Sequence, residues 1–185
     1  GYALARYKIK FKNLIISFIL MTIVIPVFTT IIPIYSFFME HSMLDSMLWT
    51  SVIFISAFIP LNIWIIMNYF RELPEDLWEA AAIEGANERQ LFFQIGLPLA
   101  KPIVLTSSLV IFLMSWKQYI IPMLLLSSHN NKVLTLIMSE FMTRDAINYS
   151  VIAMSGIIVI IPPLLASIIF RKNLVSGLTA GSVKE

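Results

Sequence analysis

The sequence has no cysteine among its 185 residues, and only 13% of the residues are charged. Without cysteine, this sequence can form neither a disulfide framework nor a thiolate-based metal or redox site. Its two histidines, His41 and His129, stand far apart, and no spacing typical of a metal site is present. There is also no glycine-rich phosphate loop ending in Lys-Ser or Lys-Thr. The sequence therefore offers no catalytic cluster, no metal site and no nucleotide-binding motif.

The low charge is matched by an excess of apolar residues. Hydrophobic residues make up 58% of the sequence, and the mean hydropathy is +0.85. A soluble domain carries about a quarter charged residues, so an apolar surface of this extent has to be hidden in lipid. The net charge of +2 is too small to favour nucleic acid as a partner.

Four apolar segments are long enough to cross a bilayer. The first contains Pro26 and Pro33, so we expect it to be a kinked helix. The sequence predicts an all-α, polytopic integral membrane protein with four transmembrane helices and a polar segment, 71–102, between the second and the third. The four expected spans cover residues 13–39, 47–70, 103–127 and 150–170.

Basic residues gather on one side of these spans. With the N-terminus in the cytoplasm, ten Lys or Arg residues lie inside and two, Lys132 and Arg144, lie outside. Positive loops remain cytoplasmic, so segment 71–102 and the tail, 171–185, are predicted to be cytoplasmic. The ten inside residues are Arg6, Lys8, Lys10, Lys12, Arg71, Arg89, Lys101, Arg171, Lys172 and Lys184.

The longest polar stretch, residues 79–102, lies in that cytoplasmic segment. Pro74 followed by two acidic residues predicts the start of a helix, because proline suits the first turn and acidic side chains complement the helix dipole. Gly85 predicts its end, since glycine readily adopts the left-handed conformation. Asn87 and Gln90, three positions apart, resemble a capping box that starts a second helix. We therefore expect a bent helical knob.

The two helices of this knob differ in side-chain size. The first carries three consecutive alanines at 80–82, which leave room for another surface to come close. The second carries an apolar face at helical spacing, formed by Leu91, Phe92 and Ile95. Pro98 and Pro102 are expected to end it.

These residues resemble the EAA loop of the membrane subunits of binding-protein-dependent ABC importers. The family pattern is Glu-Ala-Ala, three residues, Gly, nine residues, Ile, one residue and Leu-Pro, and every position is filled here. One departure is Glu84, where sugar importers often carry aspartate; the charge is kept. The pattern starts at Glu79-Ala80-Ala81, continues with Gly85 and Ile95, and ends at Leu97-Pro98.

The resemblance implies that the knob docks into a cleft on a cytoplasmic ATPase subunit. Glu79 would hold a basic residue of that ATPase, and the small residues would allow close approach. Leu91, Phe92 and Ile95 would anchor the knob. The coupling residues so implied are Glu79, Ala80, Ala81, Gly85, Leu91, Phe92, Ile95, Leu97 and Pro98.

The resemblance also implies the remaining parts of an importer. The fold would be the type I transmembrane domain of ABC importers, with further spans before residue 1. The chain itself would be no enzyme and would bind no cofactor, because ATP and Mg²⁺ would sit on the partner ATPase. The expected location is the plasma (inner) membrane, as a multi-pass protein. The implied partners are a cytoplasmic ATPase dimer, a second and different permease chain, an extracellular solute-binding protein and membrane lipid, with no nucleic acid.

Two shorter resemblances accompany the loop. Residues 175–184 are similar to the C-terminus of carbohydrate importer permeases of the maltose type, which implies a sugar or oligosaccharide as the solute. Residues 2–6, Tyr-Ala-Leu-Ala-Arg, look like the end of an earlier span in these permeases.

A candidate solute pathway follows from polar residues inside the spans, which usually face a partner or a cavity. A helical wheel of the third span places Ser108, Ser115 and Tyr119 on one stripe. Trp116 flanks this stripe on one side, and Ser107 and Gln118 flank it on the other. The same residues also suit helix–helix packing, and Asn62, two residues after Pro60, equally suits a structural role. Where the family commonly has Asn-Asp, this sequence has Lys117-Gln118, so substrate contacts do not carry over. The candidates are Asn62, Ser108, Ser115, Trp116, Gln118 and Tyr119.

Other functions remain open at this point. An ABC importer for an amino acid or an ion would share the loop, and only the tail and the aromatic stripe favour sugar. A secondary transporter or channel should show charge pairs in the membrane or repeated halves, and neither is present in the sequence. An intramembrane enzyme should place several ionisable residues at one depth, whereas Lys117 alone lies within a span.

Overall fold

The computed structural model describes residues 1–143 and 149–179, and every regular element in these ranges is helical. This confirms the all-α class. In chain order the elements are α1 (Tyr2–Arg6), α2 (Lys12–Val24), α3 (Val27–Glu40), α4 (Met47–Glu72), α5 (Glu75–Ile83), α6 (Glu88–Gln90), the π-helix η1 (Leu91–Gly96), α7 (Leu97–Trp116), α8 (Ile120–Leu125), the 3₁₀-helix η2 (His129–Asn131), α9 (Leu134–Thr143) and α10 (Tyr149–Thr179).

The chain forms two compact units. The first comprises Gly1–Thr22, Ile59–Ile111 and Ile169–Glu185, and the second comprises Ile23–Phe58 and Phe112–Ile168. Helices α4, α7 and α10 contribute residues to both units. The predicted knob therefore belongs to the first unit.

Three helical stretches within the described residues are long and apolar enough to cross a membrane: Met47–Glu72, Glu88–Trp116 and Tyr149–Arg171. The pair α2 and α3 supplies a fourth when it is counted as one span. This is a multi-pass membrane protein, with up to the four spans that the sequence predicts.

The first expected span is not one kinked helix. It is divided at Pro26, which precedes α3 with an extended backbone at φ −65° and ψ 135°. Proline cannot donate the N–H that would continue α2, and it disfavours helical geometry in the residue before it. Pro33, by contrast, lies inside α3 without ending it.

The third span also differs from the expected 103–127. Helix α7 begins at Leu97 and ends at Trp116, and a separate helix, α8, follows at Ile120. Pro98 and Pro102 therefore do not end the knob helix, as the sequence suggested, but lie within α7. The preceding π-helix explains this, because Leu97 N–H bonds to the Phe92 carbonyl, five residues back, and the wider turn accommodates a proline that has no N–H.

The fourth span continues beyond its expected end. Helix α10 runs from Tyr149 to Thr179 and contains Pro162 and Pro163. It therefore includes the start of the tail that the sequence predicts from residue 171, whereas residues 180–185 lie outside the described ranges, as do residues 144–148 with Arg144.

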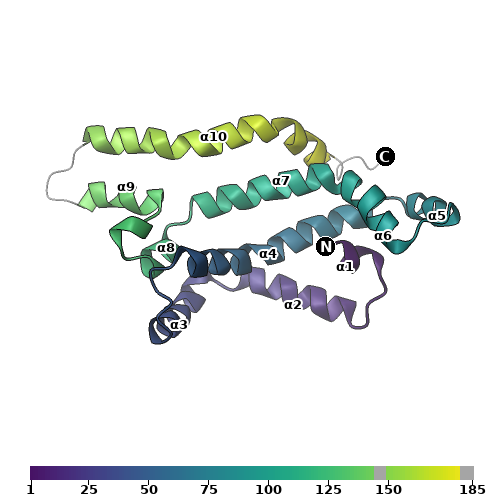
Figure 1. Cartoon of the computed structure of the whole chain (residues 1–185), viewed down its shortest axis with the longest axis horizontal. Helices are drawn as coiled ribbons and strands as arrows, with labels where there is room; N and C mark the ends of the chain where they lie inside the picture. The colour runs from purple at the N-terminus through teal and green to yellow at the C-terminus, as the bar shows by residue number, and fades with distance from the viewer. Residues whose placement is uncertain (144–148, 180–185) are drawn as a thin grey trace. The chain divides into compact units, whose positions relative to one another are not determined.

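Within the second unit, α3 and α8 lie side by side (Figure 1) and form an apolar core with Ile31, Phe38, Ile121 and Leu125. Asp45 ties the loop after α3 to the loop after α8. Its carboxylate Oδ1 accepts hydrogen bonds from the backbone N–H groups of Ser127 (3.1 Å) and Ser128 (2.9 Å).

Candidate functional site

The predicted knob, residues 75–96, consists of α5, α6 and η1. It follows α4, which ends at Glu72, and it continues directly into α7. Pro74 precedes the first turn of α5, and Glu75 and Asp76 lie in that turn, as the sequence predicts. The two acidic side chains meet the positive end of the helix dipole.

The turn at the end of α5 is built by Gly85, which has a φ of +89°. Two hydrogen bonds close the helix: Ala86 N–H donates to the Ala81 carbonyl and Gly85 N–H to the Ala82 carbonyl, both at 3.0 Å. This is the Schellman arrangement, which needs a left-handed residue at its centre. A Cβ placed on Gly85 would meet no other part of residues 1–143 and 149–179 within 4 Å, so this side of the knob is open with respect to them.

The second arm starts with the predicted capping box. Asn87 Oδ1 accepts from the Gln90 N–H at 3.0 Å, and Gln90 Oε1 accepts from the Asn87 N–H at 2.9 Å. Only Ala86 separates this box from Gly85. The bend between the two arms is therefore set by backbone N–H groups of the knob that donate to backbone carbonyls at Gly85 and to side chains in the capping box.

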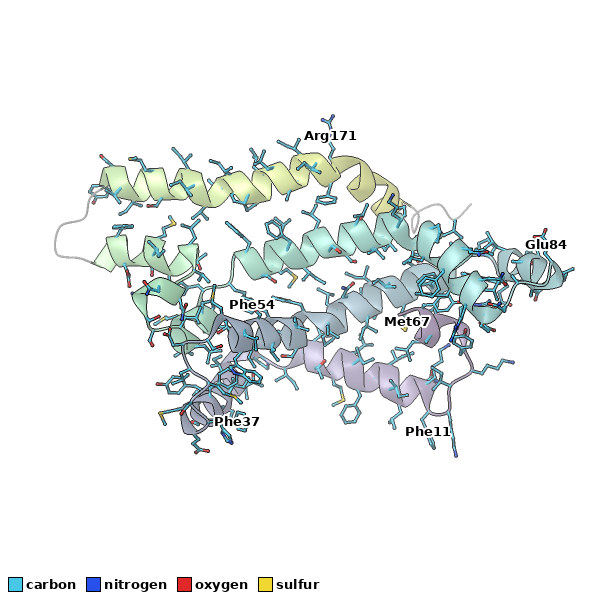
Figure 2. The ribbon with its side chains drawn as sticks, viewed as in Figure 1. Phe11, Phe37, Phe54, Met67, Glu84 and Arg171 are labelled. Atoms are coloured by element: carbon cyan, nitrogen blue, oxygen red, sulfur yellow. The ribbon has the colours of Figure 1, made fainter. Side chains whose placement is uncertain are left out.

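The tip of the knob presents small, acidic and apolar groups together. Glu79, Ala80, Glu84 and Gly85 are exposed, and Ile83 is 87% exposed. Figure 2 shows Glu84 at the end of α5. Burying an isoleucine side chain is worth about 1.5–3 kcal/mol, and among the described residues Ile83 does not gain this free energy.

Sequence reasoning missed Ile83. One sign of it was present in the sequence: an apolar residue lies between the alanines and Glu84, directly before the helix end, and belongs to no apolar face of the helix.

The base of the knob is fixed to the first unit by Trp78, whose side chain is 1% exposed. Trp78 belongs to a core cluster with Phe70, Ala100 and Ile103. Packing here is close, since a Cβ on Gly96 would lie 3.3 Å from the Trp78 ring. The knob therefore has an open tip on a buried base. The sequence analysis missed Trp78 too, although an aromatic residue directly before the motif was the available signal.

The predicted coupling residues divide between tip and base. Glu79, Ala80 and Gly85 are exposed near the tip, and Ala81 is half-buried. Leu91 is buried, and Phe92 and Ile95 are half-buried, with Ile95 packed against the Trp78 cluster. Leu97 and Pro98 are exposed at the start of α7. The apolar face of the second arm thus attaches the knob to its own chain.

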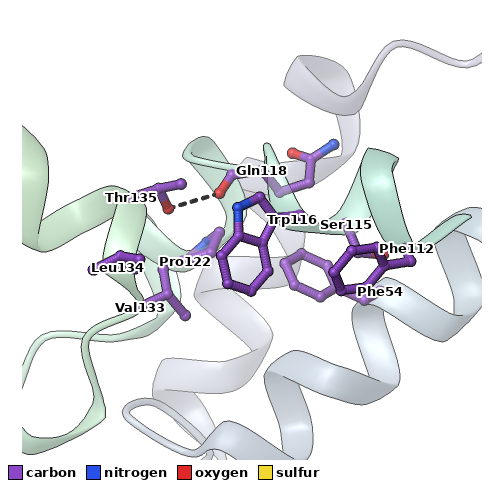
Figure 3. Close-up of a pocket in the computed structure, with 9 residues that line it drawn as sticks. All are labelled: Phe54, Phe112, Ser115, Trp116, Gln118, Pro122, Val133, Leu134 and Thr135. Carbon is purple, nitrogen blue, oxygen red and sulfur yellow. Dashed lines mark hydrogen bonds between the residues drawn. The ribbon is translucent and has the colours of Figure 1, made fainter. Parts of the chain in front are cut away.

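A pocket of about 380 Å³ lies in the second unit, around Trp116 (Figure 3). Its walls are mainly apolar and aromatic. The polar groups among them belong to Ser115, Gln118, Thr135 and the indole of Trp116. Such concave sites, with few polar groups on an apolar wall, suit small ligands. The residues that line this Trp116 pocket are Phe54, Phe112, Ser115, Trp116, Gln118, Pro122, Val133, Leu134 and Thr135.

Hydrogen bonds already engage part of this wall. Trp116 Nε1 donates to the Val159 carbonyl at 3.0 Å, and the Thr135 hydroxyl donates to the Gln118 carbonyl at 3.0 Å. The Trp116 ring packs at 5.6 Å from that of Phe112. The indole N–H is thus occupied, and the ring offers its apolar surface.

Three of the six pathway candidates, Ser115, Trp116 and Gln118, line the Trp116 pocket. The other three do not. Helix α7 ends at Trp116, so the stripe drawn on a helical wheel does not extend to Tyr119, which is 37% exposed.

The two remaining candidates have separate surroundings. Ser108 is exposed on α7. Asn62 is half-buried on α4, and its Oδ1 has no hydrogen-bond partner within residues 1–143 and 149–179.

Comparison with known proteins gives a family match over nearly the whole sequence. The family described as "Binding-protein-dependent transport system inner membrane component" matches residues 1–179. The match includes the knob, all the pathway candidates and the described part of α10.

Individual relatives match along the full chain at lower identity. The arabinooligosaccharides transport system permease protein AraQ of Halalkalibacterium halodurans is 28% identical over 184 residues. The diacetylchitobiose uptake system permease protein NgcG of Streptomyces coelicolor is 26% identical, and the melibiose/raffinose/stachyose import permease protein MelC of Bacillus subtilis is 27% identical. Each match covers 100% of this chain and, in the same order, 65%, 62% and 67% of the relative. The chain thus spans about two thirds of the length of these proteins.

Proposed function

This chain belongs to the family of binding-protein-dependent transport system inner membrane components, and we propose that it forms part of the permease subunit of an ATP-driven ABC importer. The subunit carries a sugar or oligosaccharide across the plasma membrane. It is a transport subunit and not an enzyme, because ATP and Mg²⁺ are bound by a separate ATPase.

The observation that carries this proposal is the geometry of the knob. Its tip is exposed and small, and it combines Ile83 with the Glu79 and Glu84 carboxylates. Its base is held by the buried Trp78. A surface of this kind suits insertion into a cleft, with Glu79 holding a basic residue and the Ala80 and Gly85 side allowing close approach.

Transport then follows from a rigid-body movement of the knob. A solute-binding protein delivers the solute at the outer face, and ATP closes a dimer of cytoplasmic ATPases on the inner face. The knob moves with its ATPase and tilts the spans between inward-open and outward-open states. A second permease chain of different sequence completes the pathway, with the knob and the C-terminus of each chain in the cytoplasm.

A sugar is the solute that the available observations favour. The relatives cited above are named for arabinooligosaccharides, diacetylchitobiose and melibiose, raffinose or stachyose. The Trp116 pocket adds an aromatic wall with Ser115, Gln118 and Thr135 beside it. Aromatic faces stack on the apolar faces of sugars, while polar side chains meet their hydroxyls. An amino acid or an ion is the alternative solute, and neither needs an aromatic wall.

The proposal is tested on the full-length subunit, purified in mild detergent from its host. We expect an ATPase, a second permease and a solute-binding protein to accompany it, and the ligand of the binding protein to be a sugar. Purification without an ATPase, even after cross-linking at the knob, would contradict the proposal.

Substitutions at the tip test the docking directly. Ala80→Trp and Gly85→Trp should leave the subunit in the membrane but separate ATP hydrolysis from uptake. Gly85→Asn is the matched control, because asparagine tolerates a positive φ while adding little bulk. Normal uptake by both Trp variants would refute docking at this tip.

A further inference from the structure

The short helix α1 packs against the base of the knob, although the two are far apart in the sequence. Docking of the tip does not explain this contact. The Tyr2 ring lies 5.0 Å from Phe70, 5.9 Å from Trp78 and 4.9 Å from Phe92, measured between ring centroids. Trp78 belongs to α5 and Phe92 to η1. One side chain of α1 therefore contacts both arms of the knob.

Two polar contacts strengthen this attachment. The Arg6 guanidinium lies 4.6 Å from the centre of the Trp78 ring, in cation–π geometry. The Tyr7 hydroxyl donates a hydrogen bond to Oε2 of Glu88, the first residue of α6. That bond to the carboxylate is the main cause that raises the pKa of Tyr7 to about 12. Contacts with charged partners are stronger than neutral ones.

The same, C-terminal end of α1 is also tied to α2. Lys12, the first residue of α2, donates from Nζ to the carbonyl oxygens of Ala5 (3.1 Å) and Tyr7 (3.3 Å). A cation at the C-terminal end of a helix is favourable, because it satisfies carbonyls that have no partner in the helix. The Lys12 ammonium group of α2 thus binds the C-terminal end of α1, the helix that packs against the knob.

Helices α1 and α2 also share a packing surface on α4. Leu4 of α1 and Ile16, Ile19 and Leu20 of α2 line one small crevice with residues of α4. The α4 residues are Ile63, Trp64 and Met67. The contacts of α1 therefore extend from the knob to α4, the membrane helix that precedes it.

We propose that α1, with Tyr7 and Lys12, is a clasp that joins the knob to α2, so that a displacement of the knob is passed to α2 as well as to α4 and α7. This inference rests on the proposed function, since it concerns the movement that drives transport. In the chain, the knob is continuous with α4 and α7, whereas 50 or more residues separate it from α2. The clasp supplies the link that the covalent chain does not.

The test uses two fluorescent probes in the full-length subunit, assembled with its partners in lipid vesicles. Residues 1–185 contain no cysteine. In one variant, Phe18→Cys therefore supplies the one thiol in this range, on α2. In a second variant, Arg89→Cys supplies it on the knob. Each protein is labelled before assembly, and the change in fluorescence on adding ATP is measured. When the residues of the clasp are unchanged, the fluorescence of both probes should change on adding ATP.

Substitutions in the clasp should then separate the two responses. Lys12→Gln and, independently, Tyr7→Phe should lower the α2 response about threefold while the knob response remains, because each removes a charge-assisted contact. Lys10→Gln is the matched control: it removes the same charge two residues away, where the ammonium group lies 5.3 Å from the Phe11 ring. It should leave both responses unchanged.

Each other outcome has a distinct meaning. An α2 response that is unchanged in both clasp variants overturns the clasp and leaves ATP-driven movement of the knob in place. A response that falls equally in Lys10→Gln reflects charge alone and also overturns the clasp. If neither probe responds in the unmodified assembly, the proposed function fails, and the clasp fails with it. Tyr7→Phe removes one hydroxyl from an exposed side chain, so it remains informative if Lys12→Gln does not fold.

Discussion

The hydroxyl of Tyr69, on α4, donates a 2.6 Å hydrogen bond to the carbonyl oxygen of Leu99, on α7. Leu99 lies three residues before Pro102, which is within α7. The bond therefore joins the two helices that flank the knob close to this proline.

Tyr69→Phe tests the value of this bond. The substitution keeps the ring and removes the hydroxyl, so it should lower the free energy of unfolding by about 1 kcal/mol. Thermal unfolding of the purified subunit in detergent measures the change. Tyr119→Phe is the control, because that side chain is exposed, and an equal loss in the two variants would contradict a specific role for Tyr69.

Asn87→Ala tests the start of the second arm. It removes the side chain that accepts from the Gln90 N–H, and loss of such a cap costs about 1 kcal/mol. We expect faster amide hydrogen exchange at 88–91 and little change at 75–83, where α5 has its own closing bonds. Asn87→Ser should retain most of the protection, since serine caps helices as well. Uniform protection in all three proteins would show that the box does not stabilise α6.

Ile83→Ser tests the tip without disturbing the fold. Because this side chain is 87% exposed, the stability of the isolated subunit should not fall. Binding to the ATPase should weaken about tenfold if a partner buries the side chain, while Ile83→Val should lose much less. Co-purification at graded salt and detergent concentrations measures this. Undiminished binding by Ile83→Ser would place the docking surface elsewhere on the knob.

Acid should weaken the loop that Asp45 holds in the second unit. Hydrogen bonds from Ser128, with a smaller contribution from Ser127 and Asn131, lower the pKa of Asp45 below its usual 3.8. A carboxylate with a lowered pKa stabilises the folded state above 3.8, and this contribution is lost as the pH falls through the lower, folded-state value. The unfolding temperature of the native protein should therefore exceed that of Asp45→Asn at about pH 6, and the two temperatures should be close to each other at about pH 3.

Glu72→Gln, at the end of α4, serves as the control for that experiment. It should not reproduce the effect of Asp45→Asn at either pH. A native protein whose advantage over Asp45→Asn is the same at both pH values would exclude the Asp45 carboxylate as the titrating group.

The features that the sequence predicted correctly are those coded by neighbouring residues. Gly85 adopts the positive φ expected of a glycine that ends a helix, and Asn87 with Gln90 forms the capping box. Each depends on hydrogen bonds between residues at most five apart. Apolar length likewise located the membrane helices, because the bilayer fixes how long such a segment has to be.

The features that were missed depend on context that single segments do not carry. Proline was expected to end the knob helix at Pro98, yet the π-turn before it lets the helix continue. The break after Trp116 has no glycine or proline within it to mark it. The contacts of Tyr2 with Trp78 and of Tyr7 with Glu88 join residues more than 70 positions apart, and composition alone gives no sign of such pairs.

The uninterrupted helix from Glu88 to Trp116 also makes the subunit sensitive to length. In a helix each residue advances the direction of the side chains by about 100°. One residue inserted after the knob would turn the later side chains of α7 within the first unit, the buried Ile103 and Leu109 included, relative to the tip. Sequence length in this stretch therefore sets the angle between the tip of the knob and the buried face of α7. Substitutions can change the side chains at either place, but an insertion or deletion changes the angle between them.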